Sequence, residues 1–422
     1  MKLMVIGSGG REHALAWKLA QSPKCEKLYA LPGNPGMEDV AECIPGVSVE
    51  DNKALVTLAR EKAIDLVVVG PEVPLANGIV DDLAAAGIKA FGPSRLAAEI
   101  EGSKAFSKEL MKKYAIPTAK YQVFTDAESA REYVKKEGAP IVIKADGLAA
   151  GKGVTVAMTT EEALEAIRDI MEARAFGQAG SRVVIEEFME GEEASLLAFT
   201  DGETILPMIP SQDHKRAYDG DKGPNTGGMG TYAPAPVMTP AMVQLAREKI
   251  LEPAIAAMKA EGRPYKGCLY AGLMITKDGP KVVEFNARFG DPETQVVLPL
   301  LESDLAEIMT ACVDGTLGEQ EIRWGTGAAV CVVMASGGYP GKYAKGMAIT
   351  GLDAAREAGN LVFHAGTARK DGEIVTGGGR VLGVVAKGES IREAVDAAYG
   401  GVEKIAFHGA FYRKDIAHRA LR

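Results

Sequence analysis

Four short apolar segments in the first hundred residues, separated by stretches of helical periodicity, constrain the fold most strongly. We expect strands at residues 3–6, 27–31, 66–69 and 89–91, and helices at residues 12–21, 56–62 and 75–86. Buried strands that alternate with helices are typical of a parallel sheet whose crossover helices cover its faces. The sequence therefore predicts an N-terminal parallel α/β domain over residues 1–103.

The next part of the chain has a different pattern, because some of its apolar segments are joined by tight turns. We expect helices at 103–114, 161–173, 240–259 and 304–313, and strands at 141–144, 154–157, 183–186, 194–200, 269–276 and 281–286. Asp201-Gly202 is a turn signal between two strands. These patterns predict antiparallel sheets with helices packed on them, in a second domain over residues 104–315.

Residues 211–236 form a polar stretch, rich in glycine and proline, with no periodic apolar pattern. Structureless connections of this length are usually functional or disordered. A smaller α/β unit is expected over residues 325–422, with strands near 328–334, 361–365 and 381–385 and a helix at 391–399. The fold class is thus a multidomain combination of α/β and α+β units.

Composition excludes several classes of protein. The 422 residues exceed what one compact core holds, and the net charge of −9 comes without basic clusters, so no nucleic acid is expected as a partner. The apolar run at 3–6 is too short for a signal peptide or a membrane span. Five scattered cysteines without paired spacing are typical of reduced thiols. We expect a cytoplasmic monomer that does not bind membranes.

A glycine-rich loop at residues 7–10 joins the first strand to the first helix. Free N–H groups at a helix start attract anions, and glycines allow a phosphate to approach the backbone. Glu12 stands where a dinucleotide fingerprint has its third glycine, whereas Arg11 offers a forked donor suited to a phosphate monoester. The loop favours a phosphate-bearing substrate, and a dinucleotide or a ligand-free turn are the alternatives.

Pro71 and Glu72 follow the third predicted strand of this domain. Ligands of open α/β sheets bind at the carboxyl ends of strands. Glu72 can therefore accept hydrogen bonds from ribose hydroxyls or an amine, and a solvated loop acid is the alternative.

Lys144 lies on a predicted strand that leads into a second glycine-rich loop, residues 147–153, with Lys152 at its tip. The loop lacks Walker spacing but suits a flexible lid over phosphates, and the lysines suit phosphates as point charges. The segment 186–189 ends the next strand, where an acid and backbone groups can read the edge of adenine, and Glu193 is placed for the ribose. An acidic surface stretch with solvated lysines is the alternative.

Glu284 and Asn286 are two residues apart on a predicted strand, so their side chains share one face, which Arg288 continues. An unpaired buried charge costs about 3–5 kcal/mol. Carboxylate and amide oxygens suit Mg²⁺, which takes few protein ligands and completes its shell with phosphate oxygens and water. A metal ion therefore explains the pair.

Together these motifs resemble the ATP-grasp superfamily and, within it, the glycinamide ribonucleotide synthetase family. The resemblance covers GSGGREHA (7–14), GNPG (33–36), GPE (70–72), KADGLAAGKG (144–153), SQDHKR (211–216), GPNTGGMG (223–230), EFNARFGDPE (284–293) and SGGYP (336–340). It implies an N-terminal domain, an ATP-grasp core with a mobile lid at about 120–195, and a C-terminal domain. It also implies ATP-dependent ligation of glycine to 5-phosphoribosylamine through glycyl phosphate, in de novo purine biosynthesis, with Mg²⁺ or Mn²⁺.

The resemblance assigns roles to individual residues. Catalytic roles fall to Lys144, Asp213 and Arg288, and the metal ligands are Glu284 and Asn286. ATP is expected to contact Lys104, Lys144, Gly151, Lys152, Gly153, Glu186, Glu187, Phe188, Met189 and Glu193. Glycine and phosphoribosylamine are expected to contact Gly9, Gly10, Arg11, Glu12, Pro71, Glu72, Asp213, His214, Lys215, Arg288, Asp291, Pro292 and Glu293. Many relatives carry an acidic metal ligand on the preceding strand, but residues 269–274 supply none.

Two rival functions stay open at this stage. An ATP-grasp carboxylase acting on a purine precursor or on biotin would share the nucleotide site, although the loops 213–216 and 225–230 favour the glycine ligase. A nucleotide-sensing module without catalysis would bind ATP and leave it intact.

Overall fold

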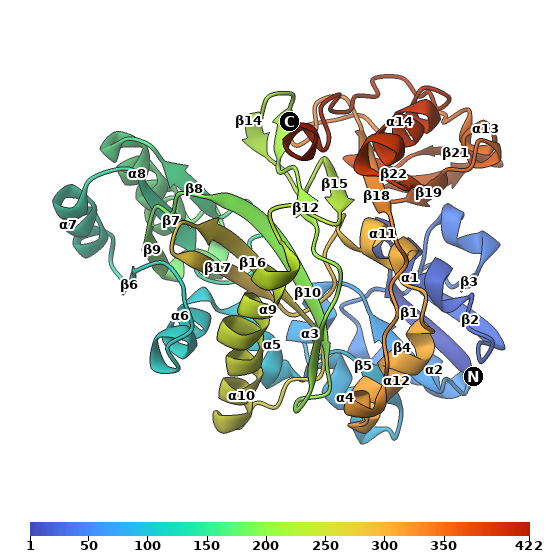
Figure 1. The fold of residues 1–422 in the computed structure, drawn as a ribbon, viewed down its shortest axis with the longest axis horizontal. Coiled ribbons are helices and arrows are strands. Elements are labelled where there is room, and N and C mark those ends of the chain that lie inside the picture. Colours follow the sequence, from blue (N-terminus) through green and yellow to red (C-terminus); the bar gives the residue numbers. More distant parts are fainter.

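The computed structural model describes residues 1–422, and its N-terminal part is a five-stranded parallel sheet in the order β3-β2-β1-β4-β5 (Figure 1). The strands are β1 (Lys2–Gly7), β2 (Lys27–Pro32), β3 (Glu42–Cys43), β4 (Leu66–Val69) and β5 (Lys89–Phe91). Helices α1 (Gly10–Leu19) and α2 (Asn52–Glu61) provide crossovers, and η1 (Pro35–Asp39) follows β2. The four predicted strands and their parallel arrangement are confirmed, because fully apolar runs such as β4 are buried on both faces.

The single helix predicted at 75–86 is wrong. The chain forms two helices there, α3 (Glu72–Ala76) and α4 (Ile79–Ala85). Gly78 between them has a φ of +81°, a conformation that breaks a right-handed helix and that glycine adopts without steric cost. The apolar residues resume helical spacing after the break, which is why periodicity alone did not reveal it. Helix α3 begins at Glu72, and only Gly70 and Pro71 separate it from the end of β4.

A four-stranded antiparallel sheet in the order β6-β9-β7-β8 forms the part of the molecule farthest from the N-terminal domain (Figure 1). It is reached through α5 (Arg95–Gly102) and α6 (Lys104–Lys113), and its strands are β6 (Tyr121–Phe124), β7 (Ile141–Ala145), β8 (Val154–Ala157) and β9 (Val183–Glu187). Helices α7 (Ala127–Glu137) and α8 (Thr160–Ile167) pack on it, followed by η2 (Arg168–Glu172) and η3 (Gly177–Ser181). We call this sheet and its helices the lid.

A second antiparallel sheet, β11-β10-β16-β17, faces the lid. Its strands are β10 (Glu192–Thr200), β11 (Ile205–Pro207), β16 (Gly267–Thr276) and β17 (Gly279–Asn286). The accompanying helices are α9 (Pro240–Ala246), η4 (Arg247–Leu251), α10 (Glu252–Ala260), α11 (Thr294–Val297), η5 (Leu298–Leu300), α12 (Leu305–Asp314) and η6 (Leu317–Glu319). The strands predicted at 269–276 and 281–286 are confirmed, and they form the hairpin of β16 and β17.

The expectation that residues 211–236 lack regular structure is wrong. They contain β12 (Gln212–Asp213), β13 (Arg216–Tyr218), β14 (Lys222–Asn225) and β15 (Gly230–Ala233). Strands β13 and β14 form a hairpin, while β12 and β15 join a sheet in the order β12-β15-β18-β22-β19. Such short strands carry too few residues for a period of two to be visible, and β18, one partner of β15, is distant in sequence.

The remaining strands of that sheet come from the C-terminal part of the chain, as predicted. They are β18 (Ala328–Ala335), β19 (Leu361–His364) and β22 (Arg380–Gly388), with α13 (Leu352–Glu357), α14 (Ile391–Val402) and η7 (His418–Leu421) beside them. A small hairpin of β20 (Thr367–Lys370) and β21 (Glu373–Thr376) extends from it. The C-terminal sheet is therefore assembled from two separate stretches of sequence.

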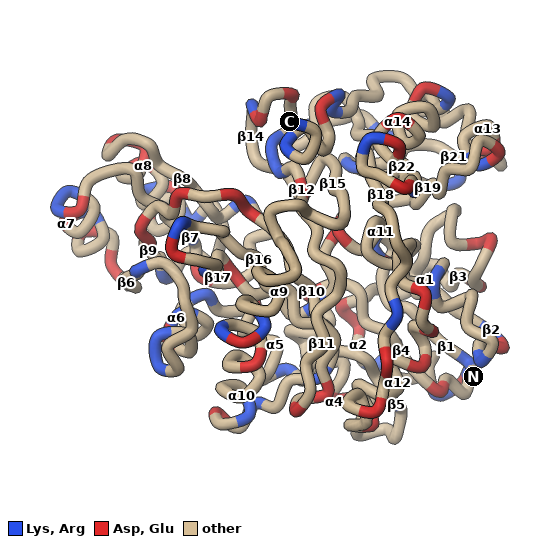
Figure 2. The backbone as a smooth tube through the Cα atoms, viewed as in Figure 1, with Lys and Arg blue, Asp and Glu red and all other residues tan.

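Basic and acidic residues are interspersed along the backbone, without a long run of basic residues (Figure 2). None of the helices combines the length and apolar character that crossing a membrane requires.

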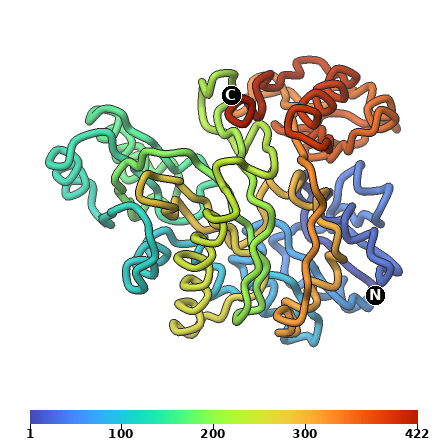
Figure 3. The backbone as a smooth tube through the Cα atoms, viewed as in Figure 1, coloured from blue at the N-terminus to red at the C-terminus, as the bar shows by residue number.

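The apolar cores explain how the parts are joined. Two of the four apolar clusters mix side chains of the N-terminal domain with side chains of the second antiparallel sheet, so these two parts share a core. The lid has a separate core of 12 buried residues, all within residues 130–185. Figure 3 shows the same division, with the lid extending away from the N- and C-terminal parts of the chain. A separate core lets a unit move as a rigid body.

Candidate active site

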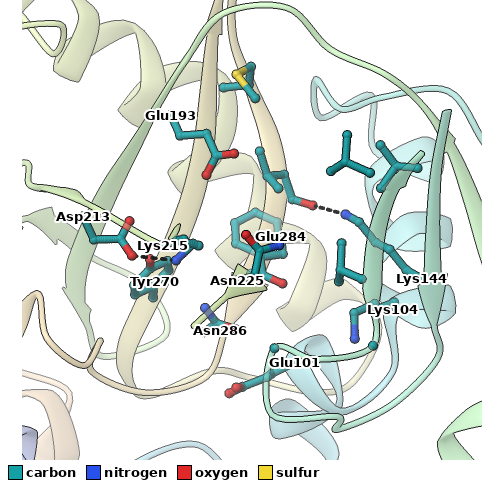
Figure 4. Close-up of a pocket in the computed structure, with 18 of the residues that line it drawn as sticks. Glu101, Lys104, Lys144, Glu193, Asp213, Lys215, Asn225, Tyr270, Glu284 and Asn286 are labelled. Atoms are coloured by element: carbon teal, nitrogen blue, oxygen red, sulfur yellow. Dashed lines mark hydrogen bonds and ion pairs between the residues drawn. The ribbon is translucent and has the colours of Figure 1, made fainter. Parts of the chain in front are cut away.

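A cavity of about 1060 Å³ is bounded by the lid, the second antiparallel sheet and residues of both the N-terminal domain and the C-terminal sheet. Most predicted site residues line it: Arg11, Glu72, Lys104, Lys144, Gly151, Gly153, Glu186, Glu187, Phe188, Met189, Glu193, Asp213, Lys215, Glu284, Asn286, Arg288, Asp291 and Glu293. Figure 4 shows how several of these side chains converge from different strands and helices. Outside the lining lie Gly9, Gly10, Glu12, Pro71, Lys152, His214 and Pro292.

Glu186 connects two lysines at the lid side of the cavity. Its Oε1 lies 3.0 Å from Nζ of Lys144 and its Oε2 lies 3.2 Å from Nζ of Lys108. All three side chains are buried. Burial lowers the pKa of Lys108 to about 8, although Glu186 opposes the shift. Lys144 thus points into the cavity from β7 while Glu186, on the neighbouring strand β9, holds its ammonium group in place.

Glu284 and Asn286 lie on β17 and both face the cavity, as predicted (Figure 4). Burial disfavours the charged form of Glu284, but Lys144 and further cations outweigh it and hold the pKa of that carboxyl below its ordinary value. Across the hairpin, Gly272 of β16 pairs with Glu284, so this strand supplies no second acid at the site.

The donor set suits a hard divalent ion that is shared with a substrate. No group of three or more His, Cys, Asp and Glu side chains in the chain could hold a metal ion by itself. One carboxylate and one amide oxygen nevertheless fit Mg²⁺ or Mn²⁺ where phosphate oxygens and water complete the coordination. Glu284 and Asn286 therefore fit a metal that binds together with a phosphorylated ligand.

Arg288 joins the cavity to the N-terminal part of the chain. Its NH2 lies 2.9 Å from Oε1 of Glu101, and its Nε lies 3.4 Å from Oε2 of Glu72. Burial raises the pKa of Glu101, and Arg288 offsets this only in part. Burial acts in the same direction on Glu72, but Arg288 and Arg11 outweigh it and lower the pKa of Glu72. Arg288 thus lines the cavity and also neutralises the charges of Glu72 and Glu101.

Two acids share the part of the cavity beside β16. Asp213 accepts a hydrogen bond from Nζ of Lys215 at 2.7 Å, and Glu293 accepts one from the Tyr270 hydroxyl at 2.9 Å. The Tyr270 hydroxyl also lies 2.8 Å from Oγ of Ser195. Burial and the charge of Asp213 raise the pKa of Glu293. This pair of acids with one lysine can orient an amine and a carboxylate.

Glu12 is used inside the N-terminal glycine loop. Its Oε2 accepts the N–H of Gly9 at 2.7 Å, and its Oε1 lies 2.7 Å from Nε of Arg11. A β-carbon at Gly70 would lie 2.2 Å from the same carboxylate, so only glycine leaves room for Glu12 there. Arg11 also donates from NH1 to the carbonyl of Phe289 at 3.3 Å. Two nitrogens of the Arg11 guanidinium, Nε and NH1, are therefore hydrogen-bonded within the protein. The Arg11 side chain also lines the cavity.

Arg380 of the C-terminal sheet contacts Asp291, and both residues line the cavity. Arg380, the first residue of β22, donates to the carbonyl oxygens of Asp291 at 3.1 Å and Gly228 at 3.3 Å. Burial opposes ionisation of Asp291, but Arg380 and Arg11 outweigh it and hold the pKa of Asp291 below its ordinary value. The cavity wall is thus completed by residues from three parts of the chain.

His214 faces away from the cavity and toward the C-terminal segment. Its Nε2 accepts a hydrogen bond from the backbone N–H of Ala417 at 3.0 Å. Burial, with Arg413 nearby, lowers the pKa of His214 to about 3, so the ring is neutral near pH 7.

Comparison with known proteins decides the family. Models of three domains of phosphoribosylglycinamide synthetase match the chain: the N domain over residues 1–101, the ATP-grasp (A) domain over 102–294 and the C domain over 329–419. The chain belongs to this family. It is 55% identical over its full length to phosphoribosylamine–glycine ligase of Halalkalibacterium halodurans, of which it covers 97%. It is also 55% identical to the trifunctional purine biosynthetic protein adenosine-3 of Gallus gallus, of which it spans 42%.

The fold of the chain also matches solved structures, one of which is a phosphoribosylamine–glycine ligase. The crystal structure of phosphoribosylamine–glycine ligase from Thermotoga maritima matches with a TM-score of 0.87 at 36% identity, covering 98% of this chain and 100% of that one. The biotin carboxylase domain of 2-oxoglutarate carboxylase from Hydrogenobacter thermophilus matches with a TM-score of 0.75 at 17% identity, covering 97% and 91%. At 17% identity, the match to the biotin carboxylase domain shows a shared fold and nothing about activity.

Several cavity residues of this family member were not predicted from its sequence. They are Glu101, Lys108, Tyr270 and Arg380. Lys108 follows Lys104 by one helical turn on α6, a spacing that places both on one face and could have revealed it. The other three lie on segments whose sequence resembles ordinary helix or strand, so only the tertiary fold brings them to the site.

Proposed function

We propose that this chain ligates glycine to 5-phosphoribosylamine with ATP, giving glycinamide ribonucleotide, ADP and phosphate, in de novo purine biosynthesis. One observation carries the proposal: a single cavity joins the pair Glu284 and Asn286 to Arg11 and Asp291 beside the N-terminal glycine loop. A ligase of this kind must hold a nucleotide, an amino acid and a phosphoribosyl group within reach of one another. The names of relatives at 55% identity support this assignment.

ATP is assigned to the space between the lid and the second antiparallel sheet. Its adenine would meet Glu186, Glu187, Phe188 and Met189, its ribose Glu193, and its phosphates Lys104, Lys144, Gly151, Lys152 and Gly153. Burial lowers the pKa of Lys104, while Glu284 opposes that shift. A cation that already faces the metal ligands is well placed for a triphosphate.

The two other substrates are assigned to the opposite end of the cavity. The phosphate of phosphoribosylamine would lie against Gly9, Gly10 and Arg11, with Glu12 supporting the loop and Pro71 and Glu72 beside the ribose. Glycine and the reacting amine would be framed by Asp213, Lys215, Asp291 and Glu293, with His214 and Pro292 fixing the backbone of these segments.

In the proposed reaction, a carboxylate oxygen of glycine attacks the γ-phosphorus of ATP, and ADP leaves. The amine nitrogen of phosphoribosylamine then attacks the carbonyl carbon of glycyl phosphate, phosphate leaves, and the nitrogen loses a proton. Lys144 and Arg288 neutralise charge on the transferred phosphoryl group. The work of the enzyme is positioning rather than covalent catalysis.

Glu284 and Asn286 would hold the divalent metal, Mg²⁺ or Mn²⁺, that this family uses with ATP. When bound, the ion supplies charge neutralisation for phosphoryl transfer. Since an acyl phosphate hydrolyses in water, we also propose that the lid closes over the cavity during the reaction. Its separate core supports motion as one body.

Isotope transfer tests this route directly. With glycine labelled by ¹⁸O in both carboxyl oxygens, the released phosphate should carry one ¹⁸O atom per turnover, because the attacking oxygen stays on phosphorus. Mass spectrometry of the phosphate measures this. Unlabelled phosphate would exclude glycyl phosphate, and ATP consumption that continues without glycine would favour the carboxylase alternative. Binding of ATP without hydrolysis, with all substrates present, would favour the sensor.

Replacing Arg11 by alanine should raise the KM for phosphoribosylamine by roughly 10- to 100-fold, because a charge-assisted contact to phosphate is lost. The KM values for ATP and glycine should change little. Steady-state kinetics with phosphoribosylamine formed from ribose 5-phosphate and ammonia measures all three. Arg369→Gln is the matched control, since Arg369 is an exposed arginine paired with Glu38 outside the cavity. An unchanged KM for phosphoribosylamine would place the phosphate elsewhere.

The organisation of the protein is part of the same proposal. We assign residues 1–103 to the phosphoribosyl-substrate domain, 104–315 to the ATP-grasp domain with its lid at about 120–195, and 325–422 to the C-terminal domain. The protein would act as a cytoplasmic monomer on small molecules.

A further inference from the structure

The hairpin of β13 and β14 forms one wall of the cavity, where Arg216, Asp221 and Asn225 line it. A two-stranded ribbon is at best marginally stable by itself. Its position must therefore be set by contacts with other parts of the chain.

Those contacts come from the end of the chain, residues 413–419, which we call the C-terminal clamp. Gly220 donates its N–H to Oδ2 of Asp415 at 2.9 Å, and Lys414 donates its N–H to Oδ1 of Asp219 at 2.8 Å. Arg419 reaches Oδ2 of Asp221 at 2.8 Å. The turn of the hairpin is thus bonded to the clamp on both of its sides.

Arg413 lies at the centre of the clamp and is fully buried. Its NH2 lies 3.0 Å from Oδ1 of Asp221, its Nε donates to Oδ1 of Asp415 at 2.8 Å, and its NH1 donates to the carbonyl of Arg216 at 3.2 Å. Arginine is rarely buried completely, and such burial is unfavourable unless the guanidinium is fully paired. Here NH1 and NH2 bond the hairpin at β13 and at its turn, while Nε bonds Asp415 within the clamp.

The clamp also reaches the segment that precedes the hairpin. Ala417 donates its N–H to Nε2 of His214 at 3.0 Å, and His214 stands between Asp213 and Lys215 in the sequence. Asp213 and Lys215 line the cavity next to Glu293. The position of these two side chains is therefore linked to the clamp through one buried histidine.

We infer that Arg413 is a positioning residue, which through the C-terminal clamp fixes segment 213–225 and thereby shapes the glycine subsite. The inference rests on the proposed function, because it assigns glycine to Asp213, Lys215 and Glu293. A residue far from the reacting atoms can act in this way, since small displacements of binding groups weaken binding strongly.

The test is Arg413→Met in the full-length protein. The KM for glycine should rise roughly 10- to 100-fold, whereas the KM for ATP stays within about twofold of wild type. Release of the hairpin should also speed tryptic cleavage after Lys222, read by mass spectrometry. Arg413→Lys keeps the charge without the fork and should fall between wild type and Arg413→Met. Arg392→Met, at an exposed arginine of α14, should match wild type.

Opposite results would overturn the inference. Unchanged KM for glycine with unchanged cleavage would show that the clamp does not position the segment. Equal increases of the KM for glycine and for ATP, with a large fall of the melting temperature, would make Arg413 a general stabiliser. If Arg413→Met does not fold, Asp221→Asn breaks the same contact from the partly exposed side and must reproduce the selective effect on glycine. Wild-type enzyme that forms no product from glycine would instead refute the proposed function.

Discussion

Replacing Glu284 by alanine should lower metal-dependent kcat by roughly 10³-fold or more, since charge stabilisation of a phosphoryl group accounts for effects of this size. Glu284 is the one carboxylate of the pair on β17, and Gly272 opposite it offers no substitute. The carboxylate lies among cations that hold its pKa below the ordinary value, so its loss also removes one negative charge near Lys144, which keeps its ion pair with Glu186. Steady-state rates over a range of Mg²⁺ and Mn²⁺ concentrations measure the effect.

The matched control for this substitution is Glu373→Ala, because Glu373 is an exposed acid on β21, away from the cavity. The melting temperature of Glu284→Ala should stay close to that of wild type, since Glu284 forms the cavity wall rather than the core. Near-normal turnover of Glu284→Ala at saturating Mg²⁺ would refute the metal assignment.

The regular part of the fold was accessible from the sequence because it depends on local patterns. Long apolar runs such as β1 and β4 identify buried parallel strands, and the turn between β16 and β17 identifies a hairpin. The break at Gly78 was missed because helical periodicity continues on both sides of it. Strand β15 was missed because its partner β18 lies about a hundred residues further along the chain, and β12 was missed because it consists of two residues that pair with β15.

The residues of the site could likewise be predicted from the sequence only where a local pattern places them. Glu284 and Asn286 could be predicted because a strand places alternate residues on one face. The contact of Glu12 with substrate stays a prediction, whereas the hydrogen bonds of its carboxylate with Gly9 and Arg11 could not be read from the sequence. The sequence shows that a polar residue lies near a motif, but it does not show which neighbouring groups form hydrogen bonds with that residue in the fold. Arg380 lies almost ninety residues from Asp291, and only the packing of the C-terminal sheet brings them together.

Replacing Arg288 by methionine should destabilise the protein by about 3–5 kcal/mol and abolish activity, because it leaves buried charge without a partner. Glu101 is the residue most affected. It is buried, it pairs with Arg288 at 2.9 Å, and its remaining partner is the N–H of Ala287 at 2.8 Å. Unfolding followed by circular dichroism measures the loss, and Arg392→Met serves again as the exposed control.

The pH dependence of this loss identifies its cause. Burial already raises the pKa of Glu101 in the folded protein, and removal of Arg288 raises it further. A carboxyl with a raised pKa in the folded state stabilises the fold when protonated, and this contribution disappears as pH rises through the folded pKa. The deficit of Arg288→Met relative to wild type should therefore be largest near pH 7.5 and smaller near pH 5. Adding Glu101→Gln should recover part of the stability at pH 7.5 without restoring activity. A deficit that does not vary with pH, or that Glu101→Gln does not reduce, would mean that lost packing rather than an unpaired carboxylate destabilises the variant.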